Sequence, residues 1–160
     1  MKRNDDPDYV IGVISDTHGT VRPSVLELFE GADLIVHAGD VGKPDVLDAL
    51  GSVASVIAVR GNMDRDEWSQ NLPVTKVVEV RGVMLYTLHD LTQLDFDPAA
   101  AGFGAVISGH THRASIHRKQ GVLYVNPGCS GSGSGSRPPT VALLRLGGRG
   151  LDAEVVELED

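Results

Sequence analysis

Apolar runs of strand length alternate with helix-like segments over the first sixty residues, and this alternation constrains the fold most. The run at 9–15 (YVIGVIS) is continuously apolar, which is typical of a strand buried on both faces of a parallel sheet. Similar runs lie at 34–37 and 55–59, with helices expected at 25–29 and from Pro44 to Gly51. This order implies right-handed parallel crossovers, which bring the strand ends to one edge of the sheet.

After residue 60 the pattern changes to short strands joined by tight turns. The runs at 74–80 and 83–88 flank Arg81-Gly82, which indicates a hairpin. A short helix is expected at 98–101, and further strands at 105–108, 114–118, 122–125, 141–146 and 153–157. We therefore predict an α/β fold of two packed mixed β-sheets flanked by helices, the first sheet partly parallel and the second mostly antiparallel.

The length of 160 residues and the 41% share of hydrophobic residues predict a single domain over 1–160 with a substantial core. The segment at 128–136 (GCSGSGSGS) has the composition of a linker. Strand-like sequence lies on both sides of it, so a mobile loop inside the domain is expected instead.

The formal net charge of -8 argues against sequence-independent binding of nucleic acid, which needs a basic surface. No apolar run approaches the roughly 18 residues that span a bilayer. The single cysteine and the acidic start predict a cytoplasmic protein without a membrane segment. The oligomeric state stays open, and a homo-oligomer is compatible with the sequence.

Five polar blocks occur in one order along the chain, most of them directly after a predicted strand. They are Asp16-Thr17-His18, Gly39-Asp40, Gly61-Asn62-Met63-Asp64, His89 and Gly109-His110-Thr111-His112. Their side chains supply oxygen and nitrogen donors to divalent metals. Because the strand ends are expected at one edge, the ordered set predicts a metal centre.

Individual positions suit this role. Asp16 and His18 are two residues apart, as are His110 and His112, so each pair points the same way if the extended geometry persists. The carboxylate of Asp40 can bridge two ions, and Gly61 allows close backbone approach beside the amide of Asn62.

Taken singly, each block has another explanation. Asp16 and Asp40 could cap turns, His89 could be a satisfied core histidine, and Gly109 to His112 could be a surface turn. Only the conjunction favours a metal site. His37 and His117 lack such a block and are expected to be structural, with His37 also suited to support a ligand from behind.

The ordered blocks resemble those of the calcineurin-like metallophosphoesterase superfamily, whose pattern is D-x-H, G-D, G-N-H-[DE], H and G-H-x-H. In size the chain resembles its compact bacterial and archaeal phosphodiesterase family. The similarity covers nearly the whole chain and includes Asn126-Pro127-Gly128, which that family carries after the last ligand. The fold that this resemblance implies is an α/β sandwich of two packed sheets.

The resemblance also implies the ligands and the chemistry. One ion would be held by Asp16, His18, Asp40 and His112, and the other by Asp40, Asn62, His89 and His110. Asp40 and Asn62 would be the catalytic residues, and a hydroxide bridging the ions would attack a small phosphoester substrate. No protein nucleophile is then required. The set contains no thiolate and suits Mn, which we favour, as well as Ni, Fe, Co, Zn or Mg.

Two positions depart from the superfamily pattern. Met63 stands where many members have a histidine that would hydrogen-bond the leaving oxygen, and Asp90 follows His89 where glycine is usual. Asp90 either orients a ligand or faces solvent. Arg60 is a candidate phosphate contact because guanidinium geometry matches phosphate oxygens, and the alternative is an exposed strand-end arginine. Cys129 is expected in a flexible segment and is not expected to be a nucleophile.

Two other functions remain open. A phosphomonoesterase differs only in whether the pocket accepts a second ester group. A related eukaryotic retromer subunit uses this fold as a protein-binding scaffold with a degraded metal site, whereas all seven ligand positions here hold competent residues.

Overall fold

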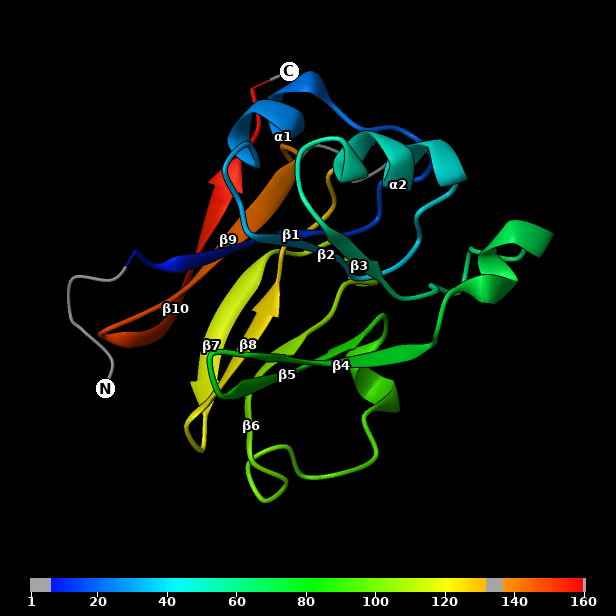
Figure 1. Cartoon of the computed structure of the whole chain (residues 1–160). Coiled ribbons are helices and arrows are strands. Elements are labelled where there is room, and N and C mark those ends of the chain that lie inside the picture. The colour runs from blue at the N-terminus through cyan, green and yellow to red at the C-terminus, as the bar shows by residue number, and fades with distance from the viewer. Residues whose placement is uncertain (1–6, 132–136, 160) are drawn as a thin grey trace.

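The computed structural model describes residues 7–131 and 137–159, and their strands form two five-stranded sheets (Figure 1). The predicted loop at 128–136 falls partly on residues 132–136, which lie outside the described residues. The first sheet has the order β10-β9-β1-β2-β3. Its strands are β1 (Tyr9–Ile14), β2 (Leu34–His37), β3 (Val56–Ala58), β9 (Thr140–Gly147) and β10 (Gly150–Glu157). Strands β1, β2 and β3 pair in parallel, and β9 pairs antiparallel with β1 and β10, so this sheet is partly parallel as predicted.

The second sheet has the order β4-β5-β6-β8-β7. Its strands are β4 (Thr75–Val80), β5 (Val83–Leu88), β6 (Phe103–Ile107), β7 (Ser115–Lys119) and β8 (Val122–Asn126). The pairs β5/β6 and β6/β8 are parallel, so the prediction of a mostly antiparallel sheet is wrong. The reason lies in the β7–β8 hairpin. Strand β8 is largely buried and takes the inner place beside β6, whereas the polar β7 (SIHRK) is exposed and forms the edge.

The helices are short and begin at prolines. They are α1 (Pro23–Leu28) and α2 (Pro44–Gly51), with 3-10 helices at Glu67–Asn71 and Leu91–Gln93 that the sequence did not predict. The helix expected at 98–101 does not form. The backbone there makes hydrogen-bonded turns, which end at Gly102 with a φ of 85°. None of the described helices is long and apolar enough to span a bilayer.

Two apolar layers hold this arrangement together. One lies between the sheets and includes Val13 and Val36 from the first sheet and Leu85, Ile107 and Val125 from the second. The other packs α1 and α2 onto the outer face of the first sheet, as Figure 1 shows. The buried members of both layers are apolar, and the polar blocks lie in the loops that follow the strands.

Candidate metal centre

The seven predicted ligands lie in five loops, each following one of the strands β1, β2, β3, β5 and β6. Backbone hydrogen bonds tie these loops into one edge. Asp16 N–H donates to the Gly39 carbonyl at 3.0 Å, and Gly109 N–H donates to the His89 carbonyl at 2.9 Å. The two sheets are linked by His110 N–H, which donates to Asp16 Oδ2 at 3.2 Å. Groups nearly a hundred residues apart therefore share one site.

The backbone at this edge is not extended. Asp16, His18, Asp40, His110 and His112 all have positive φ, between 49° and 72°. The expectation that side chains two residues apart converge through extended geometry is therefore wrong. Left-handed turns aim these side chains instead, and such conformations in non-glycine residues persist only where the surroundings impose them.

Donor atoms lie close together around His89. Its Nδ1–H donates to the Ala38 carbonyl at 2.7 Å, so the neutral ring presents the Nε2 lone pair to the site. Nε2 lies 3.0 Å from Asn62 Oδ1 and 3.3 Å from Asp40 Oδ2. Three acceptor atoms thus meet, and a proton or a cation has to lie among them. The second histidine on this side, His110, places Nδ1 3.1 Å from the same Asn62 oxygen.

A second group of donors lies around Asp16. The Asp16 side chain is fully buried, and its Oδ1 lies 3.3 Å from His112 Nε2 and 4.0 Å from His89 Nε2. Among the buried side-chain oxygen and nitrogen atoms of the described residues, only Asp16 Oδ1 makes no hydrogen bond. The ring of His18 faces that of His112 with their centroids 5.5 Å apart.

Burial and neighbouring charges act differently on the two carboxylates. Burial raises the pKa of Asp16, against the opposing effects of the Ser15 hydroxyl and of His89 and His112. For Asp40 burial also acts upward, but hydrogen bonds from His89 and from the Met63 N–H lower its pKa to about 2. The pKa of His89 is raised, because its hydrogen bonds to Asp40 and Ala38 outweigh burial. The Asp40 carboxylate thus favours positive charge at His89, which a proton or a metal cation can supply.

The donor set fits divalent ions in several respects. With bond lengths of about 2.0 to 2.2 Å, two nitrogen or oxygen ligands of one ion lie about 3 to 3.5 Å apart. The separations of 3.0 to 3.3 Å around His89 and Asp16 agree with this value. Glycine also allows the loops to approach closely, because a Cβ on Gly61 would overlap the Asp40 carboxylate and one on Gly109 would overlap the Ser15 side chain.

Two buried residues outside the predicted ligand set, Asp64 and His37, position these loops. Asp64 accepts the N–H groups of Val41, Gly42 and Gly61 at 3.1, 3.0 and 2.9 Å. The only sequence signal for it is its place at the end of the Gly61-Asn62-Met63-Asp64 block.

His37, expected to be structural, connects two ligand loops. Its Nδ1 accepts Gly39 N–H at 3.1 Å, so Nε2–H donates to Thr17 Oγ1 at 3.0 Å. Burial lowers the pKa of His37 to about 3, which keeps the ring neutral. The other histidine outside the blocks, His117, stacks on Tyr124 with 5.0 Å between ring centroids.

The remaining singled-out residues surround the centre. Met63 is 58% exposed, while its N–H donates to Asp40 Oδ1 at 2.9 Å. Asp90 accepts from Thr92 N–H and Oγ1–H and places Oδ2 3.8 Å from His110 Nε2. Arg60 donates to Gln70 Oε1 at 2.8 Å and lines a pocket with Asn62 and His89.

The expectation that Cys129 lies in a flexible segment is wrong. The residue is 1% exposed, and its S–H donates to the Asp16 carbonyl at 3.4 Å. Ser130 N–H donates to the Ser15 carbonyl at 3.3 Å, which fixes the loop after β8 against the loop after β1. Burial raises the pKa of the thiol, which disfavours the thiolate that a cysteine nucleophile needs.

Comparison with known proteins gives relatives of the whole chain and of its fold. A probable metallophosphoesterase from Methanothermobacter thermautotrophicus is 36% identical, over 92% of this chain and 91% of that protein. The structure of an archaeal phosphodiesterase aligns with a TM-score of 0.77 and 25% identity, covering 93% of this chain and 99% of the other. Vacuolar protein sorting 29 from Cryptosporidium parvum shares the fold, with a TM-score of 0.80 and 20% identity over 97% of this chain and 94% of its own. Residues 10–149 match the calcineurin-like phosphoesterase superfamily domain, and the chain belongs to this superfamily.

Proposed function

We propose that the chain is a phosphodiesterase that depends on two divalent metal ions. The proposal rests on three acceptor atoms that lie close together. Asn62 Oδ1 is 3.0 Å and Asp40 Oδ2 is 3.3 Å from His89 Nε2. Acceptors that converge at the edge of a core are costly unless a proton or a cation lies among them, and a metal cation is the occupant that we propose. The buried Asp16 Oδ1 without a hydrogen bond supports a cation on the other side.

The ligands divide into two sets that share Asp40. Asn62, His89 and His110 surround one position with the separations given above, and Asp16, His18 and His112 surround the other. Among the divalent ions that suit these oxygen and nitrogen donors we favour Mn, and Ni, Fe, Co, Zn and Mg suit them as well. Asp40 is suited to bridge because ligand atoms of Asp40, His89 and Asp16 all lie within 4.8 Å of one another, and His89 and Asp16 belong to different sets.

When bound, the two ions would hold the phosphate oxygens, activate a water molecule and neutralise charge in the transition state. The residues of the chain orient this centre. Ala38 fixes the ring of His89 through Nδ1, and Asp64 fixes the two loops that carry Asp40 and Asn62.

A pocket beside the centre favours a diester over a monoester. It has a volume of about 530 Å³ and extends from Asn62 and His89 to Val74 and Tyr86, with Asp90 and Asp95 among its other lining residues. A monoester needs no such space, whereas the second substituent of a diester can occupy it. The two carboxylates also disfavour a doubly charged monoester more than a singly charged diester.

Arg60 has a supporting role in this proposal. It lines the same pocket, so its guanidinium can contact a phosphate oxygen once it leaves Gln70. The exchange replaces a hydrogen bond to a neutral amide oxygen by one to a charged phosphate oxygen.

The test is hydrolysis of matched aryl monoesters and diesters by protein reconstituted with Mn, compared among wild type, Asp40→Asn and Asp48→Asn. Asp40→Asn keeps an oxygen for Met63 N–H but loses the bridging charge, so we expect turnover to fall by several orders of magnitude while the fold is kept. Asp48, exposed on α2, is the control and should leave turnover unchanged.

Preference for monoesters would assign the alternative phosphomonoesterase activity. Hydrolysis of neither class by folded, metal-loaded protein would contradict the proposal and favour a protein-binding scaffold. Near-normal turnover of Asp40→Asn at saturating metal would exclude the bridging role.

A further inference from the structure

The loop after β8 brings a sulfur atom to the metal centre that the ligand sets above do not use. Cys129 is held in place by the S–H donation to Asp16 described above, and by a second contact to the Gly131 carbonyl at 3.7 Å. Both are weak hydrogen bonds of a neutral thiol. The sulfur therefore has a fixed position, and replacing these carbonyls by another partner costs little hydrogen-bond energy.

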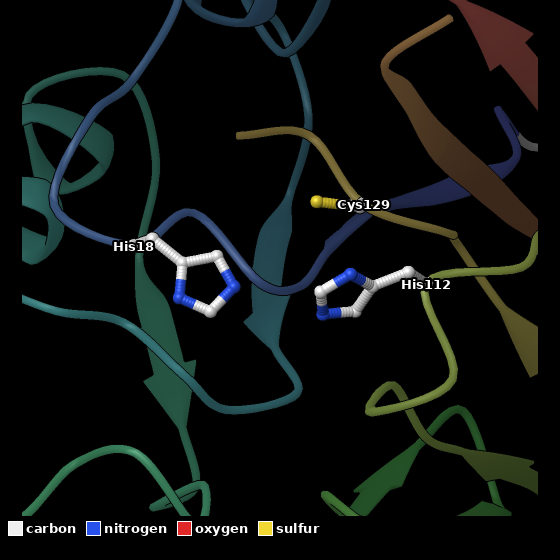
Figure 2. Close-up of side chains that lie close together, drawn as sticks. All are labelled: His18, His112 and Cys129. Atoms are coloured by element: carbon white, nitrogen blue, oxygen red, sulfur yellow. The ribbon is translucent and has the colours of Figure 1, made fainter. Parts of the chain in front are cut away.

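Two imidazole rings lie beside this sulfur. Figure 2 shows the side chains of His18, His112 and Cys129, which come from three different loops and surround one gap. One donor atom from each of them lies within 4.8 Å of the others. Nitrogen and sulfur ligands of one tetrahedral ion lie about 3.3 to 3.7 Å apart, given bond lengths of about 2.0 and 2.3 Å. His18 is exposed and His112 half-buried, so both rings can make this adjustment.

We propose that Cys129 supplies a thiolate to the metal position formed by His18 and His112. On binding, the S–H bond breaks, the proton leaves to solvent, and the sulfur donates its electron pair to the ion. The inference deepens the proposed function and rests on the metal centre that it assigns.

The consequence is a difference between the two metal positions. Thiolate favours softer ions such as Zn and Cd and is a poor ligand for Mn. The position near Asn62, His89 and His110 has only oxygen and nitrogen donors and keeps its preference for harder ions. A mixed-metal centre follows, with the softer ion held near Cys129.

Cobalt absorbance tests this inference without an activity assay. Metal-free wild type titrated with Co²⁺ should develop a thiolate-to-cobalt charge-transfer band in the near ultraviolet in addition to the visible bands of the ion. Cys129→Ser should lose the near-ultraviolet band and keep the visible bands. His117→Gln, which removes a histidine outside the site, is the control and should retain both.

Affinity gives a second readout. Cys129→Ser should weaken Cd²⁺ binding by roughly 10-fold to 100-fold or more, since even changes behind a ligand cost this much. Its affinity for Mn²⁺ should stay close to that of wild type. Should Cys129→Ser fail to fold, as judged by circular dichroism, Cys129→Ala replaces it.

Two negative results are distinguishable. Visible cobalt bands in wild type without a charge-transfer band would overturn the thiolate ligand and leave the proposed metal centre intact. Absence of cobalt binding to folded wild type would overturn the metal centre itself.

Discussion

The carboxylate of Asp64 accepts the backbone N–H of Val41 at 3.1 Å and so joins the loops after β2 and β3. Two further N–H groups, from Gly42 and Gly61, donate to the same carboxylate. In the sequence, Asp40 directly precedes Val41 and Asn62 directly follows Gly61. One buried side chain outside the proposed ligand set thus fixes the relative position of two proposed ligands.

Asp64→Asn should therefore destabilise the fold. An asparagine cannot accept all three N–H groups, because its amide nitrogen only donates, and unpaired buried donors cost about 1 to 3 kcal/mol. Urea unfolding of metal-free protein measures this loss. Asp66→Asn is the matched control, since Asp66 is exposed and its side chain does not cap the following 3-10 helix. Equal stability of both variants would mean that Asp64 does not fix the loops.

His37 should make the stability of the protein depend on pH. Its pKa is about 3 in the fold, below its ordinary value of 6.5, so the unfolded chain binds a proton between these values and the folded chain does not. Its contribution is fully present above pH 6.5 and is lost as pH falls toward 3, by up to about 1.4 kcal/mol per pH unit.

Urea unfolding of metal-free wild type and His37→Gln over a series of pH values measures this contribution. Glutamine does not titrate, so the variant should lose about 2 kcal/mol less than wild type between pH 6.5 and 4.5. Parallel losses in the two proteins would show that His37 titrates alike in the folded and unfolded chain.

Gly61→Ala should displace Asp40. The added Cβ would overlap the Asp40 carboxylate and the Asp40 backbone nitrogen. Gly61 and Asp40 lie in two different loops, and each loop supplies a proposed ligand. We expect the unfolding free energy to fall by about 1 to 3 kcal/mol. We also expect weaker binding of the metal ion held by Asp40 and Asn62. Gly51→Ala is the control, because a Cβ at that helix position meets no atom within 4 Å. Isothermal titration with Mn²⁺ compares both variants, and unchanged binding by Gly61→Ala would contradict the close approach.

Met63 should make the rate sensitive to the leaving group. Its thioether is 58% exposed and has no proton to donate, and a positioned acid contributes typically ~10² to 10⁴-fold for a poor leaving group. We expect log(kcat/KM) to fall steeply with leaving-group pKa in wild type and less steeply in Met63→His. Equal slopes at equal metal occupancy would mean that another group already serves the leaving oxygen.

The strands and the order of the site could be predicted from the sequence because both depend on local pattern. Runs such as YVIGVIS and LIVH are short, apolar and β-branched, and they form β1 and β2 as expected. The order of strand and polar block placed Asp16 and Asp40 in loops at one edge, where the structure has them.

Other features depend on contacts between distant segments. The left-handed turns at Asp16 and Asp40 follow from hydrogen bonds to other loops, which composition does not reveal. The inner place of β8 depends on burial against β6, and the burial of Cys129 depends on the loop after β1. Asp64 was visible only as the last residue of a turn-forming block, since its three partners belong to two loops.

Metal content and diester hydrolysis, measured in one preparation, decide whether hydrolysis by this chain depends on bound metal ions. Protein treated with a chelator and verified metal-free by elemental analysis should show no hydrolysis. Reconstitution should bind about two ions per chain, the number that the proposed pair of metal positions requires, and should restore activity best with Mn or Ni. Full hydrolysis by metal-free protein would contradict the account.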